Sequence, residues 1–233
     1  MSLILNGTTG ITSANIADGS IVDADIAAAT VVNLKSGRKN LIINGDTEIN
    51  QRSLINGTPA NIGNGTYTCD RWVTIQSGGA SANTSTVTGN DNNTAIRMTT
   101  LTATNAQVCH EQRIENPSRY SGKTVTVSCM IKADSNLVRI NVYDSGWNQI
   151  KSSTHTGGGG WEKLTVTGTL AASQTDLRIR IGFSNQGNVN MISGTYFDFT
   201  QVQLELGSTA TDFEHRSYGE ELALCQRYYQ KLG

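Results

Sequence analysis

Strict alternation of apolar and polar residues recurs through most of this chain and constrains its fold more than any other feature. Three segments show it clearly, over residues 124–131, 137–143 and 177–183. Successive side chains of a strand point to opposite faces, so each segment predicts a half-buried strand. The polar partners Arg139, Arg178 and Arg180 are expected to point away from the apolar face, as in an antiparallel sheet with one wet side.

Turn residues separate these segments between residues 40 and 216. The run Asp144-Ser145-Gly146-Trp147 predicts a hairpin turn, and four glycines at 157–160 predict a flexible connection. Apolar residues change parity between Phe199 and Val202, which predicts a register slip and a β-bulge near Thr200-Gln201. No long helical pattern interrupts the region, so two packed antiparallel sheets are expected.

The pattern changes near the C-terminus. Ser217 and Glu220 have the spacing of a capping box. Apolar or aromatic residues then follow three, four and three apart, at Leu222, Cys225, Tyr229 and Leu232. This spacing predicts one amphipathic helix of about 15 residues, which must dock on another surface because so short a helix is marginal alone.

A five-residue period marks the first part of the chain. Apolar residues recur at Ile11, Ile16, Ile21, Ile26 and Val31. A period of five gives neither a helix nor a flat strand a single buried face. The segments are similar to the units of pentapeptide-repeat proteins, but so few units cannot bury their own apolar row. We expect the arm to wind with identical chains; a disordered tail is the alternative.

Composition excludes several classes of protein. Only 16% of residues are charged and the net charge is −1, without a Lys/Arg cluster, so no nucleic acid partner is expected. No apolar run of about 18 residues predicts a membrane span, and the first residues do not resemble a secretory signal. The four cysteines lack metal-ligand spacing and are expected to be reduced and buried, whereas the three histidines are expected at the surface.

Catalytic motifs are missing from the sequence. Hydrolysis of a glycan needs two carboxylates roughly 5 to 10 Å apart. Three pairs are close in sequence, Asp46 with Glu48, Glu111 with Glu115, and Glu220 with Glu221. Each pair has a sufficient structural explanation at a strand or helix end, so the protein is not expected to be an enzyme.

Sugar binding needs an aromatic face for the apolar side of a pyranose and polar groups for its hydroxyls. Trp147 at the predicted hairpin tip is the best candidate, with Tyr143, Asn148 and His155 near it in sequence. Trp147 covering a sandwich edge or lying at a chain interface is the alternative. Trp72 and Trp161 lie within predicted strands and are expected in the core.

Several phrases of the sequence resemble tail fibres of tailed bacteriophages. The opening half carries NLIINGDTE at 40–48, DRW at 70–72 and SGKTVTVS at 121–128. The C-terminal part is more specific and carries VQLELG at 202–207, TDFEHR at 211–216 and EELALCQRYY at 220–229. The arm, with ADGSI at 17–21 and DADI at 23–26, also resembles fibre N-termini.

This resemblance implies a fold, an assembly and a location. The fold is an all-β jelly-roll β-sandwich similar to carbohydrate-binding modules, with an extended N-terminal β arm and a short C-terminal helix. Residues 1–37 would form the attachment and trimerisation arm and residues 38–233 the jelly-roll domain. The protein would be a homotrimer in the virion, docked on tail or baseplate proteins by its arm, and it would bind host cell-surface polysaccharide.

Related modules also carry a structural calcium ion between an early acidic residue and a late Asp-Asp pair. Glu48 matches the early position, while Thr200-Gln201 occupies the late one and Asp198 lies nearby. Such an ion would bind through carboxylate and carbonyl oxygens. Two functions stay open: glycan recognition by a receptor-binding fibre, and a structural fibre or adaptor without glycan binding. A glycan-degrading spike is the third and weakest hypothesis.

Overall fold

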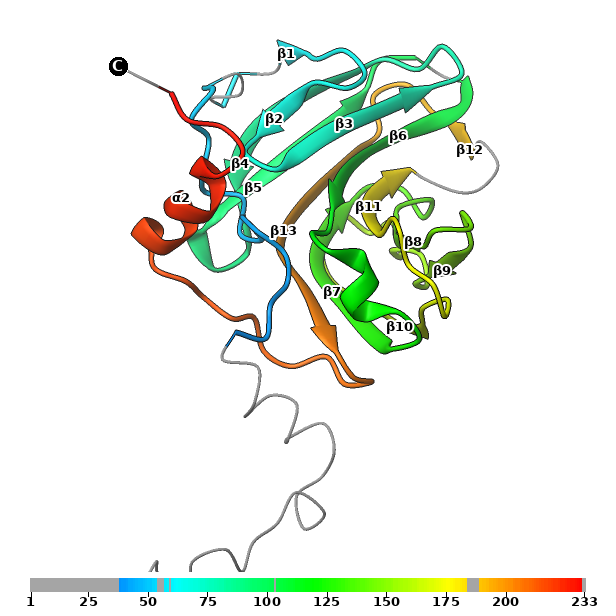
Figure 1. Cartoon of the computed structure of the whole chain (residues 1–233). Helices are drawn as coiled ribbons and strands as arrows, with labels where there is room; N and C mark the ends of the chain where they lie inside the picture. The colour runs from blue at the N-terminus through cyan, green and yellow to red at the C-terminus, as the bar shows by residue number, and fades with distance from the viewer. Residues whose placement is uncertain (1–37, 54–56, 59, 103, 184–188, 232–233) are drawn as a thin grey trace, which may run out of the picture. The chain divides into compact units, whose positions relative to one another are not determined.

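A computed structural model describes residues 38–231 except residues 54–56, 59, 103 and 184–188. Two antiparallel β-sheets pack face to face and a short C-terminal helix follows them (Figure 1). The predicted repeat arm at 1–37 lies outside the described residues, and its role stays a prediction.

Six strands form sheet A, in the order β1-β4-β5-β13-β7-β10. Their bounds are β1 Ala60–Asn61, β4 Ala82–Thr88, β5 Thr94–Thr100, β13 Tyr196–Leu206, β7 Thr124–Ala133 and β10 Trp161–Thr169. Sheet B runs β2-β3-β6-β11-β8-β9, and β12 also pairs with β6. Its bounds are β2 Tyr67–Cys69, β3 Trp72–Ser77, β6 Thr104–Arg113, β11 Arg178–Phe183, β8 Arg139–Tyr143, β9 Gln149–Lys151 and β12 Val189–Met191.

The chain passes from one sheet to the other several times, for example from β6 in sheet B to β7 in sheet A and back to β8 in sheet B. Such crossings between two sheets are typical of a jelly roll. The predicted all-β sandwich is therefore confirmed. Two short 3₁₀ helices, η3 (Asn90–Asn92) and η4 (Pro117–Tyr120), lie in the connections.

Aromatic side chains fill the space between the sheets. Trp72, Phe183, Phe197 and Phe199 are fully buried, and the rings of Trp72 and Phe199 meet edge to face at 5.1 Å. The indole Nε1–H of Trp72 donates to the carbonyl of Asn44 at 2.8 Å, which satisfies its polar atom. The prediction that Trp72 belongs to the core is confirmed.

The corresponding prediction for Trp161 is wrong. Trp161 pairs directly with Lys132 of β7, and it is only half-buried. Directly paired residues share a face. Since Ile131 and Ala133 on either side of Lys132 are buried in the core, Trp161 lies on the outer face of sheet A.

The predicted bulge in β13 is confirmed. The register between β13 and β7 shifts between Thr200 and Gln203, and Gln201 has a left-handed φ of 52°. The extra residue reverses the facing of the strand, so Phe199 and Val202 both reach the core.

The C-terminal helix α2 spans Tyr218–Gln226, and its predicted capping box is present between Ser217 and Glu220. It is shorter than predicted. The helix ends at Gln226 with Arg227 as its C-cap, so Tyr229 lies beyond it. The N–H groups of Tyr228 and Tyr229 share the carbonyl of Cys225, as is common at helix termini. In the described part of the chain, no helix has the length and hydropathy needed to span a bilayer.

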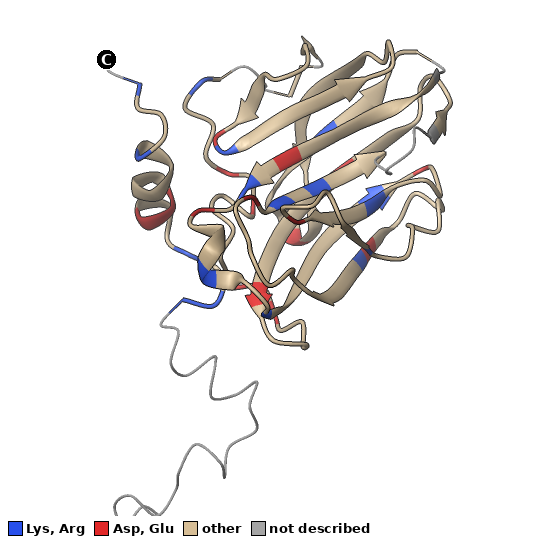
Figure 2. Ribbon diagram, turned by 45° about the vertical axis from the view of Figure 1, so that its right-hand side comes forward, with Lys and Arg blue, Asp and Glu red and all other residues tan. Residues whose placement is uncertain are grey.

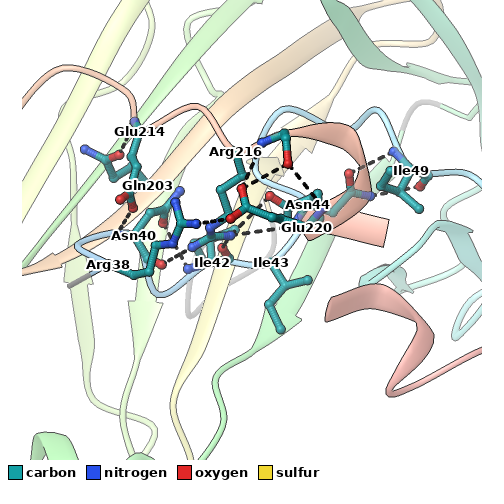
Figure 3. A network of polar contacts seen from close by, with 12 residues as sticks. Arg38, Asn40, Ile42, Ile43, Asn44, Ile49, Gln203, Glu214, Arg216 and Glu220 are labelled. Atoms are coloured by element: carbon teal, nitrogen blue, oxygen red, sulfur yellow. Dashed lines mark hydrogen bonds and ion pairs between the residues drawn. The ribbon is translucent and has the colours of Figure 1, made fainter. Parts of the chain in front are cut away.

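A buried polar clasp joins the start of the domain to its end (Figure 3). The guanidinium of Arg216 donates to the carbonyls of Asn40 and Ile42 and pairs with Glu221 at 3.2 Å. Glu221 in turn accepts a hydrogen bond of 2.5 Å from the N–H of Asn44. These residues lie in the opening and closing phrases of the tail-fibre resemblance, so those phrases hold the domain together.

The prediction for the cysteines is confirmed, whereas the prediction for the histidines is wrong for two of the three. All four cysteines are free and buried, as predicted, and burial raises the pKa of the Cys69 thiol well above its usual range. The prediction that the histidines lie at the surface is wrong for two of them, because His110 is fully buried and His155 is nearly so. His110 bonds the Thr68 hydroxyl at 3.0 Å, and burial lowers its pKa to about 3.

Candidate functional site

The outer face of sheet B gathers charged and aromatic side chains from four neighbouring strands. Directly paired residues share a face. One outer row consists of Arg113, Arg178, Tyr143 and Gln149. The next consists of Glu111, Arg180, Asn141 and Lys151. We call these two rows, with Arg139 and the β8–β9 turn, the Trp147 face.

Trp147 lies at the tip of the β8–β9 turn, where the sequence predicts a hairpin, and 50% of its surface is exposed. Its φ of 57° is left-handed, a conformation that is costly for a large L-residue. The carboxylate of Asp144 holds the turn, because its Oδ1 accepts hydrogen bonds of 3.1 Å from the N–H groups of Gly146 and Asn148. The turn thus holds an exposed indole in a strained conformation, as is common at binding sites.

Three side chains support the indole of Trp147. The guanidinium carbon of Arg178 lies 4.3 Å from the ring centroid and that of Arg180 lies 5.7 Å from it. The ring of Tyr143 meets the indole edge to face at 5.9 Å. Cation–π and edge-to-face contacts of this kind restrict the ring to one orientation.

A single buried carboxylate organises the arginines of this face. Glu111 is 2% exposed and accepts a hydrogen bond of 2.7 Å from Nε of Arg180. Its other contacts are with Arg113 at 3.4 Å and Arg178 at 3.9 Å. Burial alone would lower the pKa of Arg180, but Cys109 and the Glu111 carboxylate outweigh it and the pKa is raised. Arg180 is therefore a permanent cation beside Trp147.

The structure brings three of the four predicted glycan-binding residues together. Trp147 and Asn148 are exposed neighbours in the turn, and Tyr143 lies against Trp147 but is only 3% exposed. Tyr143 therefore acts as support rather than as a free sugar platform. His155 is buried, with Nδ1 accepting from the N–H of Gly157 and Nε2 contacting the carbonyl of Gly160 at 3.0 Å. It orders the glycine-rich connection instead.

Sequence reasoning missed Glu111 as the centre of this face. It did place Arg139, Arg178 and Arg180 on the side of the sheet away from the core. The missing signal was the pairing of β6 with β11, which sets Glu111 directly opposite Arg180. These residues are 69 positions apart, so only the register of the sheet relates them.

The predicted metal ligands lie in different surroundings. Asp198 is buried and bound by Arg97, with Nε to Oδ1 at 2.7 Å and a second contact of 2.8 Å. Glu48 is exposed. Within the described residues there is no group of three or more His, Cys, Asp or Glu side chains that could hold a metal ion. The calcium site stays a prediction from the resemblance.

Structural contacts engage the carboxylates of two of the three candidate catalytic pairs. Glu111 binds the arginines and Glu115 binds Arg227 at 2.6 Å. Glu220 completes the capping box, and Glu221 belongs to the polar clasp. Burial raises the pKa of Asp46, with a smaller contribution from neighbouring Glu48. The contacts of Glu111, Glu115, Glu220 and Glu221 give these four carboxylates structural roles.

Two cavities lie away from the Trp147 face. The larger, about 550 Å³, lies beside α2 and is lined in part by the apolar residues Ile43, Ile114 and Leu224. The other, about 400 Å³, lies at the β13 bulge and is lined in part by Gln201 and Phe213.

Comparisons with known proteins return structures of low sequence identity. No family model and no curated protein matches the chain. A solved family 4 carbohydrate-binding module is 17% identical, covers 70% of this chain and 98% of its own, and has a TM-score of 0.43. The xylan-binding CBM22-1 domain of Paenibacillus barcinonensis Xyn10C is 11% identical, with 67% and 99% covered and a TM-score of 0.40.

A third solved structure, the family 11 carbohydrate-binding module of the Clostridium thermocellum cellulase Lic26A-Cel5E, is 13% identical. It covers 66% of this chain and 98% of its own, with a TM-score of 0.41. The sandwich of the present chain follows from its own strand pairing, and its candidate site from its own side chains.

Proposed function

We propose that this protein binds glycan chains through the Trp147 face. The observation that carries the proposal is the half-exposed indole of Trp147, held in a left-handed backbone conformation and supported by Arg178 and Tyr143. A pyranose ring presents apolar C–H groups that pack on an aromatic face. An indole with a restricted orientation loses little conformational freedom when a sugar binds.

Polar groups around Trp147 can meet the hydroxyls of a sugar. Asn148 is exposed beside it, and the guanidinium groups of Arg113 and Arg178 lie in the adjoining row. A few placed polar groups around an apolar platform are typical of small-ligand sites. Single sites of this kind bind weakly, so several copies on one assembly would increase the overall affinity.

The biological setting that we propose is a homotrimeric, receptor-binding tail fibre of a bacteriophage virion. The sequence resemblance supports it, above all the closing phrases at 202–207, 211–216 and 220–229. In this proposal residues 1–37 dock on tail or baseplate proteins and the domain at 38–233 contacts polysaccharide of the host surface. No catalytic step is part of it.

A structural adaptor is the second candidate function. The observation that favours it is the cavity of about 550 Å³ beside α2, whose lining combines apolar residues with charged residues such as Arg38 and Glu115. A mixed apolar and charged surface suits a protein partner. In that case the Trp147 face would have no glycan ligand.

A glycan array probed with the full chain tests the proposal. Trp147→Ala should weaken binding of any glycan that the wild-type protein retains by about tenfold or more, as expected for a central aromatic contact. Tyr218→Ala is the matched control, because Tyr218 is also exposed, at 60%, but begins α2. It should leave binding unchanged. Equal binding by the Trp147 variant, or capture of virion proteins without any glycan, would favour the adaptor.

A further inference from the structure

The charge of the Trp147 face indicates which class of glycan it binds. We propose that its ligand is an acidic polysaccharide, one that carries carboxylate or sulfate groups, with Arg113, Arg139 and Lys151 holding the anionic groups around a sugar stacked on Trp147. This inference rests on the proposed function and specifies its substrate class.

Basic residues are concentrated on this face. Five of them belong to the paired rows and to the adjoining position 139: Arg113, Arg139, Lys151, Arg178 and Arg180. The acidic residues beside them are three: Glu111, Asp144 and Asp176. The face is therefore net positive although the whole chain has a net charge of −1. Figure 2 shows blue segments on several neighbouring strands.

The acidic residues neutralise the inner cations of this face. Glu111 bonds Arg180 at 2.7 Å, and Asp176 pairs with Arg178. The side chains of Arg178 and Arg180 are only 14% and 8% exposed. Asp144 is occupied by the hydrogen bonds of its own turn. The positive potential that reaches solvent thus comes from residues at the rim of the face.

Arg113 is an exposed cation at the rim of this face. Its side chain is 63% exposed, and its contact with Glu111 is long, at 3.4 Å. Arg113 pairs directly with Arg178, whose guanidinium stacks on Trp147. Neighbouring strands lie about 5 Å apart. A sugar stacked on the indole therefore brings its ring substituents within reach of the Arg113 guanidinium, which can bind a carboxylate or sulfate through two parallel hydrogen bonds.

Rim cations suit a charged polymer. They attract anions at long range and lose little hydration before contact. A phosphodiester chain is the other common polyanion, and proteins that bind it as a single strand stack successive bases on a series of aromatic side chains. The single exposed tryptophan gives no series of platforms for successive bases. The surface therefore favours a polysaccharide over nucleic acid.

Two matched pairs of polymers test the inference with the full chain. The first pair is polygalacturonate and its carboxyl-reduced form, and the second is dextran sulfate and dextran. We expect the acidic member of at least one pair to bind at least about tenfold more tightly. Affinity should fall on the order of tenfold between about 50 mM and about 500 mM NaCl, because the screening length shortens from roughly 14 Å to roughly 4 Å.

Variants locate the effect on the face. Arg113→Ala should weaken binding of the acidic polymer roughly fivefold, Arg113→Lys should restore only part of it because an ammonium keeps the charge but not the two parallel hydrogen bonds, and Trp147→Ala should weaken it further. Lys163→Ala is the control of equal charge change, because Lys163 is exposed on β10 of sheet A. It should bind like the wild type.

Other outcomes overturn the inference. If no acidic polymer binds, or if each neutral partner binds equally well, the ligand is not defined by its charge. The proposed function would survive that result if the glycan array still showed neutral ligands whose binding depends on Trp147. Binding of single-stranded DNA as tight as that of the acidic polymers, and insensitive to Trp147→Ala, would reveal a nonspecific electrostatic surface and would also overturn the inference.

Discussion

Nε of Arg180 donates a hydrogen bond of 2.7 Å to the carboxylate of Glu111 on the side of sheet B that faces away from the core. Both residues are nevertheless buried, at 7% and 2% exposure. Aromatic rings lie over the guanidinium, with Tyr143 at 4.6 Å and Trp147 at 5.7 Å. A small group of side chains on the outer face of the sheet is therefore buried, and its charged groups are stabilised by each other rather than by water.

Removing the charge of Glu111 should destabilise the whole domain. Glu111→Gln leaves the buried guanidinium of Arg180 without its counter-ion, and we expect the free energy of unfolding to fall by about 3 kcal/mol. Urea denaturation followed by tryptophan fluorescence measures it. Glu162→Gln, at a side chain that is 28% exposed, should change it by less than about 1 kcal/mol. Equal effects of the two substitutions would show that Glu111 is not the centre of this network.

The backbone strain at Trp147 can be measured by comparing two replacements. Trp147→Gly and Trp147→Ala both remove the indole, but glycine adopts a φ of 57° without steric cost. The glycine variant should therefore be more stable than the alanine variant by about 1 kcal/mol. Thermal or urea unfolding of the two proteins gives the comparison. An alanine variant of equal or greater stability would mean that the turn relaxes when the side chain is removed.

Stability should decrease in mild acid because His110 is buried in its neutral form. Its pKa in the folded state is about 3, well below the usual value of 6.5. The unfolded chain therefore takes up a proton as the pH falls below about 6.5, while the folded chain does not. The free energy of unfolding should fall by about 1.4 kcal/mol per pH unit between about pH 6 and about pH 4.

His110→Gln isolates this effect. The glutamine cannot titrate but can still bond the Thr68 hydroxyl, so the difference in slope between the two proteins reports His110 alone. Denaturation curves recorded at several pH values provide both slopes. Parallel slopes would mean that His110 takes up its proton over the same pH range in the folded and in the unfolded protein.

A glycine inside β11 should resist substitution. Gly182 has a φ of 134°, and a Cβ atom there would lie 2.6 Å from the ring of Phe197 and 2.7 Å from the carbonyl of Val108. Gly182→Ala should cost about 3 kcal/mol, through strain and overpacking. Gly160→Ala has no atom within 4 Å of the new methyl group and should change stability by at most about 1 kcal/mol. Equal melting temperatures for the two variants would contradict this prediction.

Local patterns in the sequence predicted much of the fold. The parity change between Phe199 and Val202 predicted a bulge, and the register shift of β13 confirms it. The Ser217 and Glu220 spacing predicted the start of α2. Such features depend on residues within a few positions of each other, which is why periodicity and turn chemistry reveal them.

Features that join distant segments could not be predicted in the same way. Trp161 belongs to a strand, as expected, but the facing of that strand follows from its pairing with β7, and it turns the indole away from the core. His155 was a candidate sugar ligand because it is close to Trp147 in sequence, whereas the fold buries it against the glycine-rich connection. A shift of register by one residue reverses the facing of every side chain, and alternation alone does not set that register.

The amino-acid sequence by itself determined the all-β character of the domain, its principal turns, its bulge and the position of a tryptophan at a hairpin tip, because each follows from short-range sterics and from the period of apolar residues. Only the tertiary structure decided that Glu111, Arg178 and Arg180 meet beside Trp147 and that Arg216 joins the two ends of the domain. Those contacts come from strands and loops far apart in the chain, and their energies depend on burial that exists only once the two sheets have paired and packed.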